Sequence, residues 1–482
     1  MAVADAELVR PREGGEGVPP TRPTDDEPIA RYFIYSGVFW LALNIMAGIV
    51  LSIFLYSPAA VQQVVPEELR AAINFGRLRP FHVWVGIFGW VSMVWVGSML
   101  YITCRLTRAR LAWPGLARVL LYAWNAVILG AAITFPLGYT QGREYAELSW
   151  PLSLLLEACF IGLAAILWRT VAQRQEPRIF VSVWLFMISA LMTPVVYGVG
   201  NKLWDPSGAY TGMNDAIINY FYIHNLFNAW FTTAAFGLVF YMLPRFTGNK
   251  LYSHRLAMWG FTSVWTGQHH ALYSPAPEWL QIVSVSFSIL TVIPNAALLG
   301  NWWLTMKGAW WQLRDNLPLR WLTVGMIFYL FTCLQGVAQS FRTFNSLVHF
   351  TNWVVGHSHL AFVAAYSFFA FGLVYYLVPR MLGRPLSPGL RRAADWHFWV
   401  SLIGITAFMY TLWFMGLEQG RDWAMSVPFM VTVRNLHGWF LIRLASGVVL
   451  GLGQVLFLYV FARYVTQRNP HPSPLPAGEG TV

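Results

Sequence analysis

Six histidines lie inside long apolar stretches of the sequence: His82, His224, His269, His270, His357 and His359. Ionisable side chains within a membrane are costly, and they are functional candidates by default. A single histidine of this kind is most simply read as a hydrogen-bonded packing residue. Six of them come from four apolar stretches, and a helical rise of 1.5 Å per residue places all six in the same outer third of the membrane. This matched depth favours one shared site.

Two of these histidines, His357 and His359, are separated by one residue. On a helix they project about 200° apart, so one helix can face two flat cofactors on opposite sides. His82 is a candidate for the second axial ligand of one of them, which gives a six-coordinate haem that transfers electrons. The other haem would have one protein ligand and an open side.

The remaining three histidines offer a set of ligands for a metal ion. His269 and His270 are adjacent and project about 100° apart on a helix. With His224 they supply three ring nitrogens, and imidazole suits copper, iron and zinc. An open fourth position admits a substrate. A metal opposite an open haem face predicts a binuclear pocket for a small diatomic molecule.

The elements that must position these histidines are membrane spans. The 482-residue chain is 57% hydrophobic and only 11% charged, whereas a soluble domain carries about 25% charge. A bilayer-crossing helix needs about 20 apolar residues. The sequence contains twelve such runs: 32–56, 80–104, 116–139, 151–170, 179–200, 216–243, 251–272, 278–306, 321–341, 350–379, 394–417 and 436–464. The fold class predicted is therefore all-α, a polytopic membrane protein with twelve transmembrane helices in one bundle.

The distribution of charge predicts how the bundle is oriented. With the N-terminus inside, the inner loops hold 19 Lys and Arg and the outer loops hold 8, which the positive-inside rule favours. We therefore expect both termini inside. The net charge of +11 follows this membrane topology and does not indicate nucleic-acid binding. We expect one catalytic domain over 31–466, with disordered tails at 1–30 and 467–482. The three cysteines match no CxxC spacing, so neither a disulfide framework nor a cysteine metal site is indicated.

Five motifs around the histidines resemble the catalytic subunit of the haem-copper oxidoreductase superfamily: GRLRPFH (76–82), GREYAELSWP (142–151), YFYIHNLFN (220–228), GQHHALYSPAPEWLQ (267–281) and NSLVHFTNWVVGHSHLAF (345–362). The resemblance implies that His82 and His359 bind the low-spin haem and that His357 is the proximal ligand of the active-site haem. It implies that His224, His269 and His270 bind the second metal. The location implied is the cytoplasmic membrane of a bacterium or archaeon.

Within the superfamily, the motifs are similar to the C-type cytochrome oxidases and to the nitric oxide reductases. Oxygen reductases need an active-site tyrosine, which one branch places four residues after the first metal histidine and the C-type branch places six residues before the histidine pair. Here those positions are Asn228 and Ser263. This departure favours the reduction of nitric oxide (NO), in which an N–N bond forms and no fourth electron is needed at once. A terminal oxygen reductase that uses an unusual tyrosine, such as Tyr220 one turn before His224, is the alternative.

The sequence also departs from the cytochrome-c-dependent nitric oxide reductases, which have a glutamate where Asn228 stands. A second glutamate of theirs aligns with Thr291, and one of the C-type oxidases aligns with Gln335. The chain therefore resembles a divergent nitric oxide reductase. Three neutral imidazoles and an amide favour copper over iron. Asn228 lies on the same helix face as His224 and is a candidate hydrogen-bond donor to the substrate. The alternative is that Asn228 only bonds a neighbouring span.

Polar residues at the outer ends of the spans are candidates for binding the haem propionates. Arg77 and Arg79 precede His82, and guanidinium groups suit carboxylates, although lipid phosphate is an alternative partner. His349 is a further candidate for contact with a propionate. The resemblance makes Glu144 a candidate ligand for a calcium ion, against the simpler interpretation of a solvated loop charge.

We expect the electron donor to be another chain. The sequence contains no CxxCH, so no haem is attached covalently here, and no cupredoxin-like domain is evident. A second subunit of cytochrome c or cupredoxin type is therefore the expected partner, together with membrane lipid.

Overall fold

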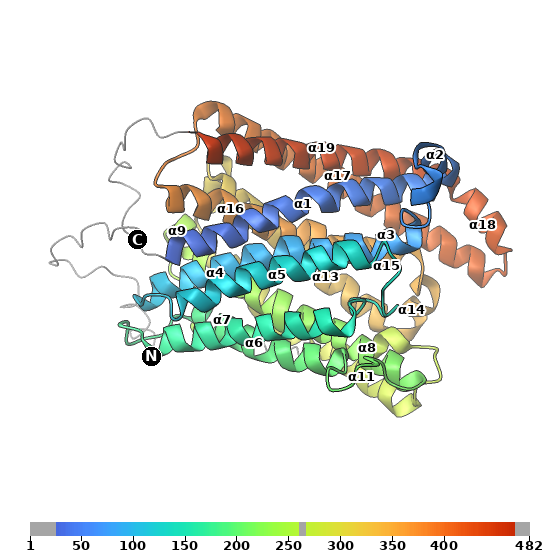
Figure 1. The fold of residues 1–482 in the computed structure, drawn as a ribbon, viewed down its shortest axis with the longest axis horizontal. Helices are drawn as coiled ribbons and strands as arrows, with labels where there is room; N and C mark the ends of the chain where they lie inside the picture. Colours follow the sequence, from blue (N-terminus) through green and yellow to red (C-terminus); the bar gives the residue numbers. More distant parts are fainter. Residues whose placement is uncertain (1–25, 260–266, 468–482) are drawn as a thin grey trace.

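A computed structural model describes residues 26–259 and 267–467 of the chain. Every regular element in these residues is helical, and the long helices run side by side as one bundle (Figure 1). We call the end of the bundle where α3, α8 and α15 begin the histidine end, and the opposite end the terminal end. α1 starts and α19 finishes at the terminal end (Figure 1), as an even number of crossings requires.

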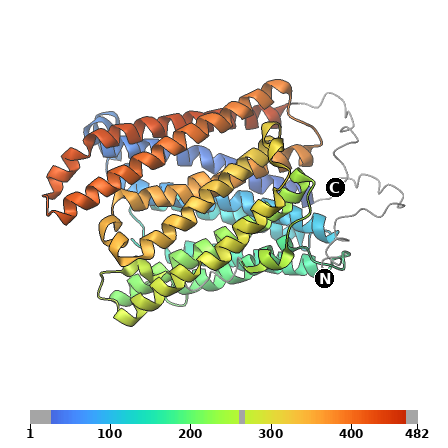
Figure 2. The same cartoon turned by 180° about the vertical axis from the view of Figure 1, so that it is seen from behind.

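Eleven of the twelve predicted spans are confirmed in the described residues. Eight of them are α1 (Asp26–Tyr56), α5 (Pro114–Thr134), α6 (Trp150–Ala172), α7 (Val181–Gly200), α11 with α12 (Glu278–Leu290 and Val292–Thr305), α13 (Leu317–Ser340), α17 (Pro388–Ala424) and α19 (His437–Thr466). In Figure 2, which shows the bundle from behind, the yellow to orange helices α11, α12 and α13 run along the side facing the viewer, beside the green helices α8 and α9. The predicted span 251–272 includes 260–266, which lie outside the described residues. On either side of them are α10 (His254–Met258) and a 3₁₀ turn, η6 (Gln268–Ala271).

The other three spans form the centre of the bundle, and each is interrupted by a π-helical segment, in which the backbone hydrogen bonds skip one residue more than in an α-helix. They are α3–η3–α4 (Phe75–Trp84, Val85–Val91, Ser92–Thr107), α8–η4–α9 (Met213–Leu226, Phe227–Thr232, Thr233–Thr247) and α15–η8–α16 (Asn352–His359, Leu360–Tyr366, Ser367–Leu382). In each of the three, 89% of the most apolar window is buried inside the protein. A helix that is apolar on all sides belongs in the centre of such a bundle.

Short helices close the histidine end. They are α2 (Pro58–Val64), η2 (Glu67–Leu69), α14 (Arg342–Val348) and α18 (Phe429–Asn435). A separate 3₁₀ turn, η7 (Trp310–Arg314), connects α12 to α13. α17 packs tightly on α15 because Gly416 has no side chain, and a Cβ there would lie 2.0 Å from the Trp353 nitrogen. The sequence-based orientation across the membrane stays a prediction, and the tails 1–25 and 468–482 lie outside the described residues.

Candidate metal centre and cofactor cavity

Three central spans carry four of the six histidines close to their π-helical segments. His82 lies three residues before η3, His224 three residues before η4, and His359 directly before η8, with His357 two residues earlier. π-segments are rare and occur often at functional sites. The additional residue in a π-helical turn rotates the part of the helix after it relative to the part before it. The turn that carries the histidine and the rest of the span can therefore face different neighbouring helices.

The predicted three-histidine cluster is present. One ring nitrogen from each of His224, His269 and His270 can be chosen so that all lie within 4.8 Å of one another. The His224 and His269 rings meet edge to face with centroids 4.9 Å apart, and the His269 and His270 centroids are 4.3 Å apart. Three neutral imidazoles gathered from α8 and η6 can hold one metal ion.

Serine side chains of α11 hold His269 in place. Ser288 donates its hydroxyl hydrogen to the Ser284 carbonyl, 2.8 Å away, so its oxygen is left to accept from His269 Nδ1 at 2.6 Å. The Ser284 hydroxyl accepts the His269 backbone N–H at 2.7 Å. With Nδ1 acting as a donor, the lone pair of Nε2 is free for a metal, as a metal-ligating histidine requires.

A cavity of about 250 Å³ separates this cluster from His357. Its lining includes all three cluster histidines, His357, Asn228 and Tyr220. The Nδ1 atom of His357 lies 3.3 Å from Gln335 Oε1, which can only accept, so Nε2 of His357 is also left free. The cavity therefore has an available imidazole on one side and a three-imidazole cluster on the other, which fits a haem and a metal ion.

His82 and His359 are prepared for ligation in another way. His82 Nδ1 lies 3.0 Å from the Asn44 carbonyl oxygen, and His359 Nδ1 lies 2.8 Å from the Val355 carbonyl oxygen. Both rings must donate through Nδ1 and leave Nε2 free. Gly48 of α1 makes room for the first ring, because a Cβ there would lie 2.9 Å from His82 Cε1. Two Nε2 atoms presented from facing helices fit the two axial positions of a haem.

A cation that the sequence did not assign lies beside these two histidines. Arg443 is on α19, it is 91% buried, and its Nε has no hydrogen-bond partner among the described residues. One terminal nitrogen reaches Asn352 Oδ1 only at 3.5 Å, and its guanidinium lies 5.6 Å from the Phe408 ring, which contacts His359. A buried charge needs a counter-charge, and a haem carboxylate would supply one. The signal for Arg443 in the sequence was a lone arginine inside an apolar run.

The predicted propionate ligands are placed unequally. Arg77 donates to the Pro136 carbonyl at 2.7 Å, and Arg79 pairs with Glu144 at 2.5 Å. Glu144 also lines the cavity, as does His349, whose pKa burial lowers below its usual 6.5. The structure therefore brings Glu144 and His349 to the cavity. Arg79 is paired with Glu144 at the cavity wall, whereas Arg77 is bonded to a carbonyl outside the cavity lining.

The three residues predicted for substrate chemistry have different outcomes. Asn228 is the second residue of the π-segment η4 and lines the cavity beside the cluster. Tyr220 also lines the cavity, and its ring stacks on His270 with an interplanar angle of 21°. Ser263 lies outside the described residues.

A buried carboxyl near His82 was also missed. Glu147 is 97% buried and accepts a hydrogen bond of 2.7 Å from Trp84 Nε1, two residues after His82. Burial raises its pKa from 4.5 to about 7, against the opposing effect of the Trp84 hydrogen bond. Two residues before it, Tyr145 lines the cavity, as does Ser358, the residue between His357 and His359. Only burial, which the sequence did not reveal, distinguishes Glu147 from a loop charge.

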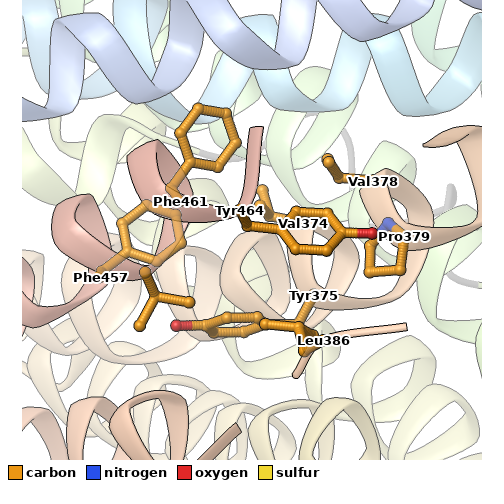
Figure 3. A pocket seen from close by; sticks show the side chains of 9 residues that line it. Val374, Tyr375, Val378, Pro379, Leu386, Phe457, Phe461 and Tyr464 are labelled. Atoms are coloured by element: carbon orange, nitrogen blue, oxygen red, sulfur yellow. The ribbon is translucent and has the colours of Figure 1, made fainter. Parts of the chain in front are cut away.

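A second pocket, between α16 and α19 towards the terminal end, is a different kind of space (Figure 3). Its lining is apolar apart from the hydroxyls of Tyr375 and Tyr464. The Tyr375 hydroxyl is 2.9 Å from His397 Nδ1, and none of the six site histidines reaches this pocket. We assign it no part in the chemistry.

Comparison with known proteins agrees with this geometry. Residues 28–449 match the family model described as cytochrome c and quinol oxidase polypeptide I. The cbb3-type cytochrome c oxidase subunit CcoN1 of Stutzerimonas stutzeri is 31% identical over 82% of this chain and 87% of its own length. A cytochrome c oxidase subunit 1 homolog of Agrobacterium tumefaciens is 29% identical over 92% of this chain and 84% of its own length.

A nitric oxide reductase matches over a shorter range. One subunit of the nitric oxide reductase of Stutzerimonas stutzeri is 28% identical over 43% of this chain and 45% of its own length. Among solved structures, a haem-copper terminal oxidase dimer superposes with a TM-score of 0.72 at 15% identity, over 92% of this chain and 86% of that one, which shows the shared fold. The chain thus belongs to the haem-copper oxidoreductases, as a member of the cytochrome c and quinol oxidase polypeptide I family.

Proposed function

We propose that this chain is the catalytic subunit of a membrane nitric oxide reductase, in which two NO, two electrons and two protons give N₂O and water. The observation that supports this function is the neutral wall of the cavity next to the three-histidine cluster. Asn228, Ser288 and Thr291 line it, and Glu144 is the sole carboxylate among the described lining residues. Asn228 occupies a position at which one branch of the oxygen reductases has its tyrosine.

The donor groups assign the cofactors that this function needs. His82 and His359 would hold a low-spin haem, His357 a second haem, and His224, His269 and His270 a metal ion for which copper is favoured over iron. When bound, these groups supply electrons and a Lewis-acidic centre to the cavity. Arg443 is proposed as the counter-charge of a propionate on the His82–His359 side, where its guanidinium has no carboxylate partner among the described residues.

The side chains of the cavity have separate tasks in this proposal. Asn228 is placed to donate an amide hydrogen to an oxygen atom of the substrate, where negative charge develops as the N–N bond forms. Tyr220 stacks on His270 and limits the rotation of that ring. Ile223, Phe227 and Ala361 give the cavity an apolar wall that suits a small uncharged molecule.

Several further assignments belong to the same proposal. We place the protein in the cytoplasmic membrane of a bacterium or archaeon, and we expect a second subunit of cytochrome c or cupredoxin type to deliver electrons. Calcium at Glu144 would have to compete with the Arg79 guanidinium, which already binds one carboxylate oxygen.

A terminal oxygen reductase is the second candidate. It is favoured by the cytochrome c oxidase names of the relatives that align along most of the chain, and by Tyr220, which places a phenol ring against His270 in the cavity. In that case Tyr220 would supply the proton and electron that cleavage of the O–O bond requires.

Turnover of the purified complex discriminates between the two functions. With a chemical electron donor, we expect the complex to convert isotopically labelled NO into N₂O, with one N₂O for every two NO consumed. Element-specific analysis should find copper in addition to haem iron. Oxygen consumption faster than NO consumption, abolished in a Tyr220→Phe variant, would establish the oxygen reductase instead.

A further inference from the structure

One carboxyl group lies inside a membrane span and has no assigned role. Glu157 is on α6, seven residues after Trp150, so it lies about 10 Å from the histidine end of that helix. It is half-buried, and exposed apolar side chains flank it on the surface of α6 and α7: Leu155, Ile161 and Val195. The Oε2 atom is buried without a hydrogen-bond partner among the described residues. An unpaired carboxyl at this depth is costly and calls for a function.

The carboxyl is directed at α7. A Cβ placed on Gly198 would lie 3.4 Å from Glu157 Oε1, so the absence of a side chain at Gly198 leaves space beside the acid. The neighbouring residue on α7, Tyr197, is completely buried. Its hydroxyl has no hydrogen-bond partner among the described residues and lies within electrostatic range of both Glu157 and Glu147. Tyr197 is therefore a buried hydroxyl near both carboxyl groups.

The row continues to the cavity. Ser153, one turn before Glu157, is buried, and its hydroxyl donates to the Leu148 carbonyl at 3.4 Å. Beyond Glu147, Tyr145 lines the cavity, and its carbonyl accepts a hydrogen bond of 2.8 Å from the hydroxyl of Tyr222, whose ring contacts that of Tyr197. Hydroxyl and carboxyl groups thus follow one another from the surface of the span to the cavity wall.

We infer that Glu157 is the entry group of a proton path that runs through Tyr197 and Glu147 to the cavity. A proton released by Glu157 reaches Glu147 by way of the Tyr197 hydroxyl, which has no hydrogen-bond partner among the described residues and so can accept one proton as it releases another. Glu157 is then reprotonated from the histidine end. No electron moves along the row, and each proton delivered is one consumed in the cavity. The inference rests on the proposed function only in that the cavity reaction consumes protons, which the reduction of either NO or oxygen does.

The first test measures proton uptake in the whole complex, with a pH-indicating dye, during turnover on whichever substrate it reduces. Glu157→Gln should slow uptake about tenfold or more, with haem spectra unchanged, and Tyr197→Phe should do the same. The matched control is Glu418→Gln, because Glu418 is also a carboxyl within a span but already accepts a hydrogen bond of 2.7 Å from Trp439 Nε1. Wild-type uptake rates in Glu157→Gln would overturn the inference, whatever the substrate.

A second test is independent of turnover. A membrane-soluble carbodiimide reacts with protonated carboxyl groups in apolar surroundings, so mass spectrometry of the treated complex should find the adduct on Glu157 and not on Glu418. If Glu157→Gln does not assemble, Glu157→Asp keeps the acid on a shorter side chain and should retain the haem spectrum with slowed uptake. Dissociation of a partner subunit from Glu157→Gln, with unlabelled Glu157 in the wild type, would identify an ion pair with the partner and refute the proton path.

Discussion

His82 and His359 donate their Nδ1–H groups to main-chain carbonyls, whereas His269 and His357 are held through the side chains of Ser288 and Gln335. A carbonyl acceptor is present whatever residue occupies that position, so the ring orientation on the His82–His359 side is set by the helix backbone. On the cavity side a single substitution removes or changes the acceptor. At the proposed electron-transfer site, the acceptors that orient the histidine rings therefore do not depend on side-chain identity. At the proposed catalytic site they do, so substitutions there can change the orientation or basicity of the rings.

The two sites also differ in the space around them. Gly48 admits the His82 ring so closely that even a Cβ would touch it. Across the cavity, the one neighbour that a Cβ on Gly336 would meet is His357 Cε1, at 3.8 Å. Close packing suits a centre that changes oxidation state with little movement, and open space suits a centre that must admit substrate and release product.

The largest effect on one site without the other should come from the loss of a histidine of the three-histidine cluster. His269→Ala leaves two imidazoles, and we expect the second metal to be lost and turnover to fall by more than about 100-fold. The optical spectrum of the low-spin haem should not change, because His82 and His359 do not contact His269. The measurements are metal analysis and absorption spectra, with His437→Ala as a control outside the cluster. A changed low-spin spectrum would show that the two sites are not independent.

Glu147 provides a test of stability against pH. It accepts a hydrogen bond from Trp84, near His82, and it lies two residues after Tyr145, which lines the cavity. Its folded-state pKa of about 7 is above the usual 4.5, so the native state binds the proton more tightly. The contribution of Glu147 to stability is then greatest below pH 4.5 and is lost as the pH rises to 7, by up to about 3 kcal/mol. Thermal unfolding of the detergent-solubilised complex between pH 4.5 and 8 measures this slope.

The matched variant for that experiment is Glu147→Gln, which cannot ionise. It should unfold with a weaker dependence on pH and be more stable than the wild type at pH 8. An unchanged slope in the variant would assign the pH dependence to other groups.

Prediction from sequence succeeded where one local pattern was sufficient. Hydropathy located the eleven spans of the described residues, and the matched depth of His224, His269 and His270 in the predicted spans indicated a cluster that the structure confirms. The second partners of the histidines were not predictable in this way. Ser288 reaches His269 across 19 residues and Asn44 reaches His82 across 38, and no periodicity relates such pairs. Arg443 and Glu147 were missed for the same reason, because their burial depends on the packing of other helices.

A smaller effect should follow from the acceptor on His269. Ser288→Ala removes the acceptor of the His269 Nδ1–H. Loss of a hydrogen-bond partner of a metal-binding histidine lowers the affinity of the site for its metal about 10- to 100-fold. Competition with a chelator measures this change. Ser286→Ala is the control, because Ser286 is on the same helix and exposed, with its hydroxyl bonded to the Ile282 carbonyl. Equal metal retention in the two variants would mean that His269 is positioned by packing alone.

The smallest effect should come from Gln335, which accepts the hydrogen bond from His357 Nδ1. Different substitutions there should shift the reduction potential of the haem in opposite directions. Gln335→Glu places a carboxylate near His357 Nδ1, which makes the imidazole more electron-donating and should lower the reduction potential of the haem that it binds. Gln335→Leu removes the acceptor and should raise that potential. Each shift should be about 60 mV or less, since about 1.4 kcal/mol corresponds to 59 mV for one electron. Redox titration of the same samples gives the potential of the haem bound by His82 and His359, whose backbone acceptors are untouched, so it should stay constant. Parallel shifts of both haems would mean that Gln335 acts through the overall field of the protein and not through its hydrogen bond.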